Sequence, residues 1–180
     1  MSEALPPIDP PTVERPSVPT YGIPETLEGT RPWSWAETRL AAAETYWVAT
    51  SRPGGRPHAM PIWAAWCAGR LWFEGGRLTR RARNLAENPA VSVGIELPDD
   101  GAVIVEGTAV RLAGPPDGLT DQLVAAFAKY ALPPRRYAVD PANWSSPDGG
   151  IWAVTPRIVF GWSSFPADAT RWQFTPSEGP

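Results

Sequence analysis

The chain has 180 residues, enough for one domain with a hydrophobic core, and 43% of them are apolar, an ordinary fraction for a globular protein. A net charge of -3 gives no general attraction to nucleic acid or acidic membranes, so neither is an expected partner. Cys67 is the only cysteine and His58 the only histidine, which excludes an internal disulfide and argues against a metal site. No apolar run is long enough to cross a bilayer and no secretion signal is seen, so a cytoplasmic location is expected.

The first 30 residues are crowded with proline, which favours an extended or disordered arm over helix or sheet. The arm is either a plain tail or a segment that wraps a partner subunit. Residues 31–175 are then expected to form the one folded domain, and residues 176–180 a short tail.

A helix and two hairpins are expected next. Ser34 and Glu37 have the spacing of a capping box and predict a helix that continues over residues 36–44. Pro57 and Pro61 cannot donate ladder hydrogen bonds, so their strand is expected at an edge or bulged. The signals that follow the helix are strand 45–51, turn 52–55, strand 56–66, turn 67–70 and strand 71–74.

The second half of the chain begins where Gly75 and Gly76 release it into a short helix from Thr79 to Asn88, which Pro89 ends. The later elements are strand 90–96, turn 98–101, strand 102–112, helix 119–130, a Pro-rich surface loop 132–150, strand 151–162 and strand 169–174. Strands in hairpins around a few short helices predict a mostly β fold, an antiparallel closed or half-closed barrel.

The start of the short helix is a candidate phosphate site. Thr79, Arg80, Arg81 and Asn84 combine a hydroxyl, guanidinium groups and the free N–H groups of a helix N-terminus, which together suit a phosphate. Arg81 is expected at an exposed position. The alternative is a capped helix with solvated arginines.

The strands before this helix are candidates to line a flat ring. Their backbone can bond the polar edge of the ring while side chains cover its faces. The alternative is ordinary barrel core, which is equally favoured for Ile62 and Phe73. The residues in question are Met60, Pro61, Ile62, Trp63, Phe73 and Glu74.

Three further residues are candidates for contact with substrate or the cofactor tail. His58 is a general base, a haem ligand or, as we favour, a strand residue packed beside the pocket. Arg171 and Trp172 either reach the cofactor of one of two subunits or form a surface arginine stacked on an aromatic ring. No catalytic residue can be assigned with certainty.

The order and spacing of several short segments resemble the pyridoxamine 5'-phosphate oxidase-like superfamily, in particular its flavin/deazaflavin oxidoreductases. The resemblance covers roughly residues 34–174. The segments that carry it are 46–50, 55–58, 61–63, 71–73, 79–85, 88–89, 105–109 and 170–174.

The resemblance implies an antiparallel split β-barrel of the FMN-binding type, a homodimer with two cofactor sites at the subunit interface. Relatives bind FMN or coenzyme F420, and some bind haem. A basic residue commonly follows the hydroxyl residue by two positions in this family, often lysine, and here it is Arg81. The further substrate-binding pattern of a true pyridoxine-pathway oxidase is not seen.

The function expected from this resemblance is an F420- or FMN-dependent oxidoreductase that moves a hydride to or from a small conjugated or aromatic substrate. The alternatives are a carrier or sensor that holds flavin, deazaflavin or haem without turnover, and a dimeric scaffold with a vestigial pocket. F420 is preferred over FMN because its lactyl and polyglutamate tail carries several carboxylates, which suit the extra cations Arg77, Arg80, Arg81 and Arg83.

Overall fold

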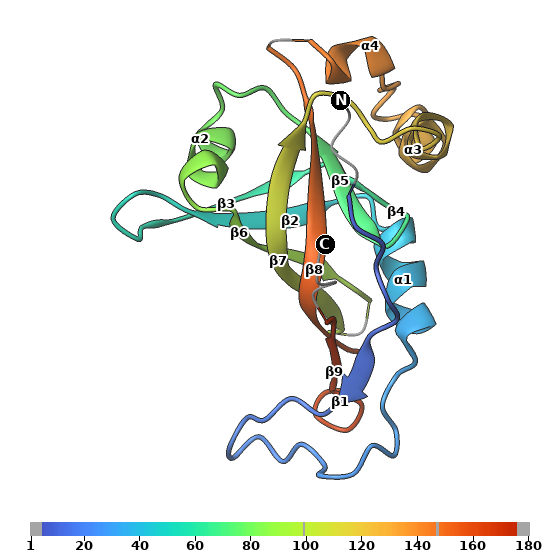
Figure 1. The fold of residues 1–180 in the computed structure, drawn as a ribbon. Coiled ribbons are helices and arrows are strands. Elements are labelled where there is room, and N and C mark those ends of the chain that lie inside the picture. Colours follow the sequence, from blue (N-terminus) through green and yellow to red (C-terminus); the bar gives the residue numbers. More distant parts are fainter. Residues whose placement is uncertain (1–4, 99, 147, 176–180) are drawn as a thin grey trace.

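A computed structural model describes residues 5–98, 100–146 and 148–175, and in it a mostly antiparallel β fold carries a few short helices (Figure 1). Every strand pairing is antiparallel, so the mostly β prediction is confirmed. The strands are β1 (Thr12–Glu14), β2 (Tyr46–Ser51), β3 (Pro57–Ile62), β4 (Ala65–Cys67), β5 (Arg70–Glu74), β6 (Ala90–Glu96), β7 (Ala102–Leu112), β8 (Ile151–Trp162) and β9 (Thr170–Gln173). The helices are α1 (Trp33–Ala42), α2 (Arg80–Glu87), α3 (Thr120–Phe127), the 3₁₀ turn η1 (Ala128–Tyr130) and α4 (Pro141–Trp144).

The sheet runs in the order β1-β9-β8-β7-β6-β2-β3, and β4 and β5 attach through β8. The first part of β8 pairs with β5 and the last part with β9, while β7 pairs along its length. The register between β7 and β8 shifts at Glu106/Gly107, opposite Pro156. A Cβ on Gly107 would lie 2.1 Å from the carbonyl oxygen of Thr155, so only glycine fits this bulge. The bulge lets one long strand serve two parts of the barrel.

Two hydrophobic clusters share the strands β5 and β8, because successive side chains of a strand point to opposite faces. Leu71 and Phe73 point into the larger cluster, together with the inner residues of β2, β6 and β7 and the helix α1. Trp72 and Ile151 point into a second cluster, which α3, η1 and α4 cover (Figure 1). Both faces of β5 are therefore buried, which fixes the position of the loop that leads from it into α2.

Several boundaries differ from those expected. The N-cap of α1 is Pro32, which makes no side-chain hydrogen bond to the helix, so the predicted capping box at Ser34 is wrong. The helix ends at Ala42. The strand expected over residues 56–66 divides into β3 and β4, since Trp63 and Ala64 break the pairing. The Pro-rich loop contains α4, and the Pro-rich arm contributes β1, which pairs with β9. The expected tail at residues 176–180 lies outside the described residues. Within the described ranges, no helix has the length and apolar character that a membrane crossing needs.

Candidate functional site

The N-terminus of α2 has the local structure expected of an anion site. Thr79 caps the helix, and its hydroxyl oxygen accepts a hydrogen bond from the backbone N–H of Ala82 at 3.2 Å. The first N–H groups of a helix have no intrahelical partner, so those of Arg80 and Arg81 are free to bind an acceptor. A Cβ on Gly76 would lie 2.5 Å from the carbonyl oxygen of Asp148, which explains why the chain enters the helix through glycine.

Arg81 is a buried cation. Only 7% of its surface is exposed, its Nη2 donates to the carbonyl oxygen of Glu74 at 3.2 Å, and its guanidinium lies 4.6 Å from the centre of the Phe73 ring. Burial lowers the pKa of Arg81. No ion pair joins it to a carboxylate of the described residues. The expectation of an exposed side chain is therefore wrong, and what lies beside the helix start is a positive charge without a counter-charge.

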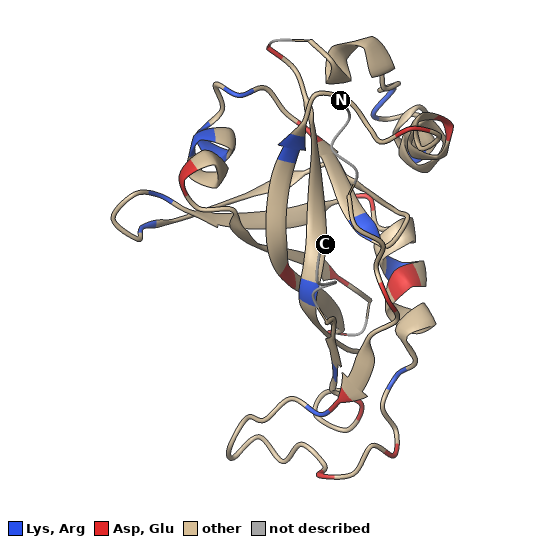
Figure 2. Cartoon of the chain, in the orientation of Figure 1, with Lys and Arg blue, Asp and Glu red and all other residues tan. Residues whose placement is uncertain are grey.

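The remaining arginines of this region are near the surface. Arg77, Arg80 and Arg83 are exposed. Figure 2 shows basic residues on α2 and again on the hairpin between β2 and β3, which carries Arg52 and Arg56. A chain with a net charge of -3 thus has a cluster of positive charge on one side of the candidate site.

Phe73 and Glu74 lie next to the helix start, where Phe73 is buried and the carboxylate of the half-buried Glu74 is already hydrogen-bonded. Phe73 is fully buried and stacks on Trp152, with ring centres 6.0 Å apart. The carboxylate of Glu74 accepts hydrogen bonds from the hydroxyl of Tyr137 and from Nε1 of Trp144. These two residues hold Arg81 and the neighbouring loop in place, and the structure does not place them on an open cofactor face.

Asn84 connects the helix to the sheet. It is fully buried, and its Nδ2 donates to the hydroxyl oxygen of Thr50 at 2.9 Å. Thr50 in turn pairs across the strands with His58 of β3. Both Asn84 Oδ1 and His58 Nδ1 are buried without a hydrogen-bond partner in the described structure. The arrangement connects α2 to β2 and β3, and it leaves two buried polar atoms without a hydrogen bond.

The residues of β3 form the second half of the candidate site. By register, Met60 and Ile62 share the face of His58, and Pro61 lies on the opposite face. Met60 is 39% exposed and Trp63 42% exposed, unusual for large apolar side chains. Trp63 stacks on Tyr130 with ring centres 5.5 Å apart. A cavity of about 450 Å³ at this end of β3 is lined by Thr45, Pro61, Ile62 and Trp63.

The C-terminal candidates lie elsewhere in the fold. Trp172 is fully buried against Trp33 and Trp35, so it cannot present a face to a cofactor. Arg171 forms an ion pair with Glu14 of the arm. The strands β9 and β1 lie at the opposite end of the molecule from α2 (Figure 1). Arg171 is half-buried and pairs with Glu14, and none of the cation–π contacts of the described residues includes it. Trp172 is a core residue.

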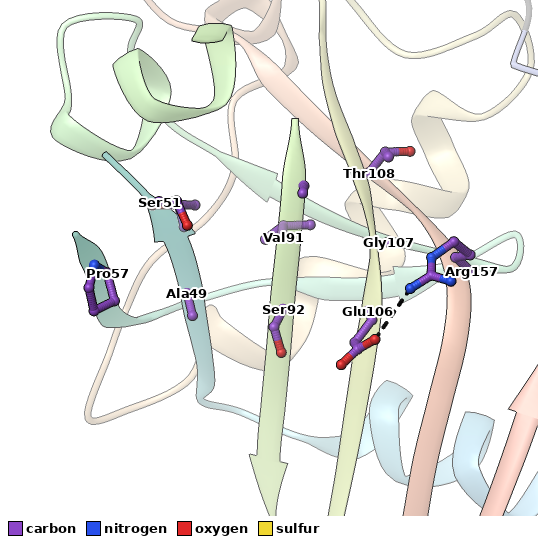
Figure 3. Close-up of a pocket in the computed structure, with 11 residues that line it drawn as sticks. Ala49, Ser51, Pro57, Val91, Ser92, Glu106, Gly107, Thr108 and Arg157 are labelled. Carbon is purple, nitrogen blue, oxygen red and sulfur yellow. Dashed lines mark ion pairs between the residues drawn. The ribbon is translucent and has the colours of Figure 1, made fainter. Parts of the chain in front are cut away.

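A second cavity, which the sequence reasoning missed, lies on the outer face of β2, β6 and β7 and has a volume of about 360 Å³. Figure 3 shows small side chains such as Ala49, Ser51 and Ser92 around it, with Glu106 and Arg157 at one side. The Glu106 carboxylate and the Arg157 guanidinium are 3.5 Å apart. The only signal in the sequence was the alternation of small outward residues with buried valines in β6.

In this fold an antiparallel sheet curves around the larger hydrophobic cluster and leaves a short basic helix beside the edge strand β3, as in a split β-barrel protein. The model of the pyridoxamine 5'-phosphate oxidase family matches residues 36–163, more than half of the chain, and the protein belongs to that family. Among proteins with curated descriptions, none matches the sequence. In the described residues, no group of three or more His, Cys, Asp or Glu side chains is arranged to hold a metal ion.

Three solved structures with the same fold are similar to the chain. An F420 reductase is 23% identical, with a TM-score of 0.52, over 68% of this chain and 94% of that one. A conserved hypothetical protein from Mycobacterium tuberculosis is 22% identical, with a TM-score of 0.60, over 74% and 85%. A heme binding protein from Mycobacterium smegmatis is 22% identical, with a TM-score of 0.58, over 81% and 59%. At these identities the likeness shows the fold.

Proposed function

We propose that the protein is an oxidoreductase that uses F420 or FMN to move a hydride to or from a small conjugated or aromatic substrate. The observation that carries this proposal is Arg81, a buried guanidinium at a helix start with no carboxylate partner among the described residues. An uncompensated buried cation is unfavourable unless an anion joins it. The family to which the chain belongs supports a phosphate-bearing cofactor as that anion.

The residues at the start of α2 fit a phosphate. Arg81 donates one N–H group to Glu74 and keeps others for a second acceptor. The backbone N–H groups of Arg80 and Arg81 face the free end of the helix, where an anion is favoured by the helix dipole. The exposed guanidinium of Arg80 can close over the anion from the solvent side.

The strand β3 fits a flat ring. Met60 and Trp63 are more exposed than apolar residues of this size usually are, and a bound ring would cover them. A flavin or deazaflavin, when bound, supplies the hydride transfer itself. The work of this chain is then to position the ring, to exclude water from its face and to hold the substrate beside it.

F420 is the preferred cofactor. Its tail continues beyond the phosphate with several carboxylates, whereas FMN ends there. Arg77, Arg80 and Arg83 are exposed around the helix start, and the β2–β3 hairpin adds Arg52 and Arg56 on the same side (Figure 2). A single phosphate does not require this many cations, and a carboxylate-rich tail would use them.

The homodimer is part of the same proposal, and the outer face of the sheet is its proposed interface. Trp47, Gly94, Ile104 and Phe160 form one row across β2, β6, β7 and β8. Trp47 is 48% exposed, and no atom lies within 4 Å of the position that a Cβ on Gly94 would take. The row thus offers an aromatic projection beside a notch, a self-complementary shape that suits a two-fold interface.

A second candidate function is a protein that holds haem or flavin without turnover. His58 favours it, because the only histidine of the chain lies half-buried on the open strand with an unbonded ring nitrogen. A haem binding protein also shares the fold. A steady-state reduction assay separates the two functions, since only the oxidoreductase turns over. The α and β bands of reduced haem in the absorbance spectrum would identify haem as the bound group.

The test of the proposed function is a set of fluorescence titrations of the apo-protein with FMN, with F420 and with F420 that lacks its glutamate tail. Intact F420 should bind most tightly. Arg81→Met should weaken the binding of all three ligands, whereas Arg83→Met should weaken the binding of intact F420 only. Tighter binding of FMN, or equal binding of F420 with and without its tail, would reject the preference for F420. Undiminished binding to Arg81→Met would reject the phosphate assignment.

A further inference from the structure

A groove lies between the N-terminal arm and the barrel, at the bulge of β8. It has a volume of about 290 Å³, near the lower end of the range for small-molecule pockets. Its apolar lining comes from two distant parts of the chain, Pro6, Pro7 and Ile8 on the arm and Pro156 and Phe174 on the barrel. Figure 1 shows the arm running along this side of the sheet.

Arg70 supplies a buried positive charge to this groove. Only 5% of its surface is exposed, its Nε donates to the hydroxyl oxygen of Thr155 at 3.2 Å, and its Nη2 donates to the carbonyl oxygen of Pro6. A guanidinium has five N–H groups, so these contacts leave donors for a further acceptor. None of the ion pairs formed by the described residues includes Arg70.

Two other arginines that bind across the fold have an acid partner, whereas Arg15 bonds backbone carbonyl oxygens alone among the described residues. Arg31 pairs with Asp168 and Arg171 with Glu14, although both arginines are more exposed than Arg70. Burial lowers the pKa of Arg70, as it does for Arg81. The barrel therefore holds two buried guanidinium groups without a described carboxylate. One lies at the start of α2, and the other lies at this groove.

Two further groups of the groove can bind an anion. The hydroxyl of Thr155 accepts from Arg70, so its own hydrogen remains available to donate. Arg157, the bulged residue of β8, lines the rim with an exposed side chain and is 3.5 Å from Glu106. Polar donors at one side of an apolar pocket are the usual arrangement for a ligand with one charged end.

We infer that this groove binds a small carboxylic acid with an apolar body, and that Arg70 and Thr155 hold its carboxylate. A carboxylate matches the planar fork of a single guanidinium, which can donate two parallel hydrogen bonds. The proline, isoleucine and phenylalanine walls suit a short aliphatic chain or one aromatic ring. Because the arm forms one wall, the bound acid would fasten residues 6–8 to the barrel. This site is separate from the proposed cofactor site and does not depend on it.

The experiment is a calorimetric titration of the full chain with benzoate and hexanoate, and with neutral benzamide as the matched control. Benzoate should bind saturably, and benzamide at least about tenfold more weakly, since a charge-assisted hydrogen bond is lost. Arg70→Met, which keeps the length of the side chain, should lower the affinity for benzoate by about tenfold or more. Thr155→Val should lower it several-fold while Arg70 stays in place.

Two controls separate this site from others. Arg81→Met should bind benzoate like the unchanged chain, because Arg81 belongs to the other buried guanidinium site. A circular dichroism melt of each variant shows that it is folded, and Thr155→Val keeps the test open if Arg70→Met does not fold. The inference is overturned if no acid binds saturably, if benzamide equals benzoate, or if Arg81→Met rather than Arg70→Met and Thr155→Val loses binding. In each of those cases Arg70 only anchors the arm through the Pro6 carbonyl.

Discussion

The carboxylate of Glu74 accepts a hydrogen bond of 2.6 Å from the indole Nε1 of Trp144, a residue 70 positions later in the chain. Its other oxygen accepts from the hydroxyl of Tyr137. Burial raises the pKa of that hydroxyl, and the bond to Glu74 raises it further, so Tyr137 remains a donor throughout the neutral range. One carboxylate thereby fastens the segment between η1 and β8 to the loop that enters α2.

Glu74→Gln should loosen that segment. The amide keeps the shape of the side chain but offers one acceptor oxygen in place of two, so one of the two donors loses its partner. We expect the free energy of unfolding to fall by about 1–3 kcal/mol, measured by urea denaturation. Glu87→Gln, at an exposed position of α2, is the matched control and should change it by less than about 0.5 kcal/mol. Equal effects of the two substitutions would show that Glu74 does not fasten the segment.

Arg81→Met should separate stability from binding. Methionine fills the space over Phe73 without a buried charge, so the apo-protein should be as stable as before, or more stable. The affinity for FMN should nevertheless fall by about tenfold or more, because a charge-assisted hydrogen bond to the phosphate is lost. Thermal melts and fluorescence titration measure the two effects. A large loss of apo stability with unchanged FMN affinity would mean that Arg81 is purely structural.

Trp47→Arg and Gly94→Arg should each convert the proposed dimer to a monomer. Both place a charge on the row of side chains that crosses the outer face, and neither side chain contributes to the core. Multi-angle light scattering at micromolar concentration measures the mass. Val124→Arg, on the exposed side of α3, is the control and should leave the dimer intact. A monomeric unchanged chain would remove the two-chain cofactor site.

The only lysine should make stability depend on pH. Lys129 Nζ donates to the carbonyl oxygens of Ala41 and Ala43 and to the hydroxyl of Tyr46, and burial lowers its pKa from 10.5 to about 8, partly opposed by Glu44. Between those two pH values the unfolded chain binds more protons than the folded chain. The free energy of unfolding should therefore rise with pH between about 8 and 10.5. Below about pH 8 both states hold the proton, and this stabilising contribution is absent.

Lys129→Met should remove the rise while lowering stability overall. Tyrosines act in the opposite sense at higher pH, since burial raises the pKa of Tyr130 to about 12 and that of Tyr46 further, and the unfolded tyrosines ionise first. Urea denaturation at about pH 7, 8, 9 and 10 measures the slope, which is positive wherever the unfolded state is the more protonated. An unchanged slope in the variant would show that Lys129 does not titrate in this window.

The sequence predicted the elements whose signals are local. The alternation in β6 and β7 and the sequence from Thr79 to Pro89 produced strands and a helix within a residue or two of the observed bounds. The capping box at Ser34 failed because Pro32 already fixes the extended backbone that a helix start needs. A short sequence pattern predicts a helix boundary well where no adjacent residue, such as Pro32 here, sets the boundary first.

The sequence indicated which types of residue form the candidate site, but it did not indicate which of them are buried. Arg81 looked solvated because charged residues of a short helix usually are, whereas its burial results from contact with Phe73 and from the missing Cβ of Gly75, where one would lie 2.8 Å from Nη2. Glu74 was predicted beside the ring, and its carboxylate accepts hydrogen bonds from Trp144 and Tyr137. Partners this far apart in the chain leave no periodic signal in the sequence.

The edge strands β3 and β1 have a consequence for how copies of this protein can associate. At one edge, β3 carries Pro57 and Pro61, which have no N–H groups to offer an added strand. At the other edge, the three-residue β1 covers β9 and is itself bounded by prolines at Pro11 and Pro16. Strand addition, the route to fibrils and open polymers, is therefore hindered at both of these edges, and the remaining edge strand, β4, has only three residues. A face of the sheet is then the favoured surface for association, and a self-complementary face would close after two copies.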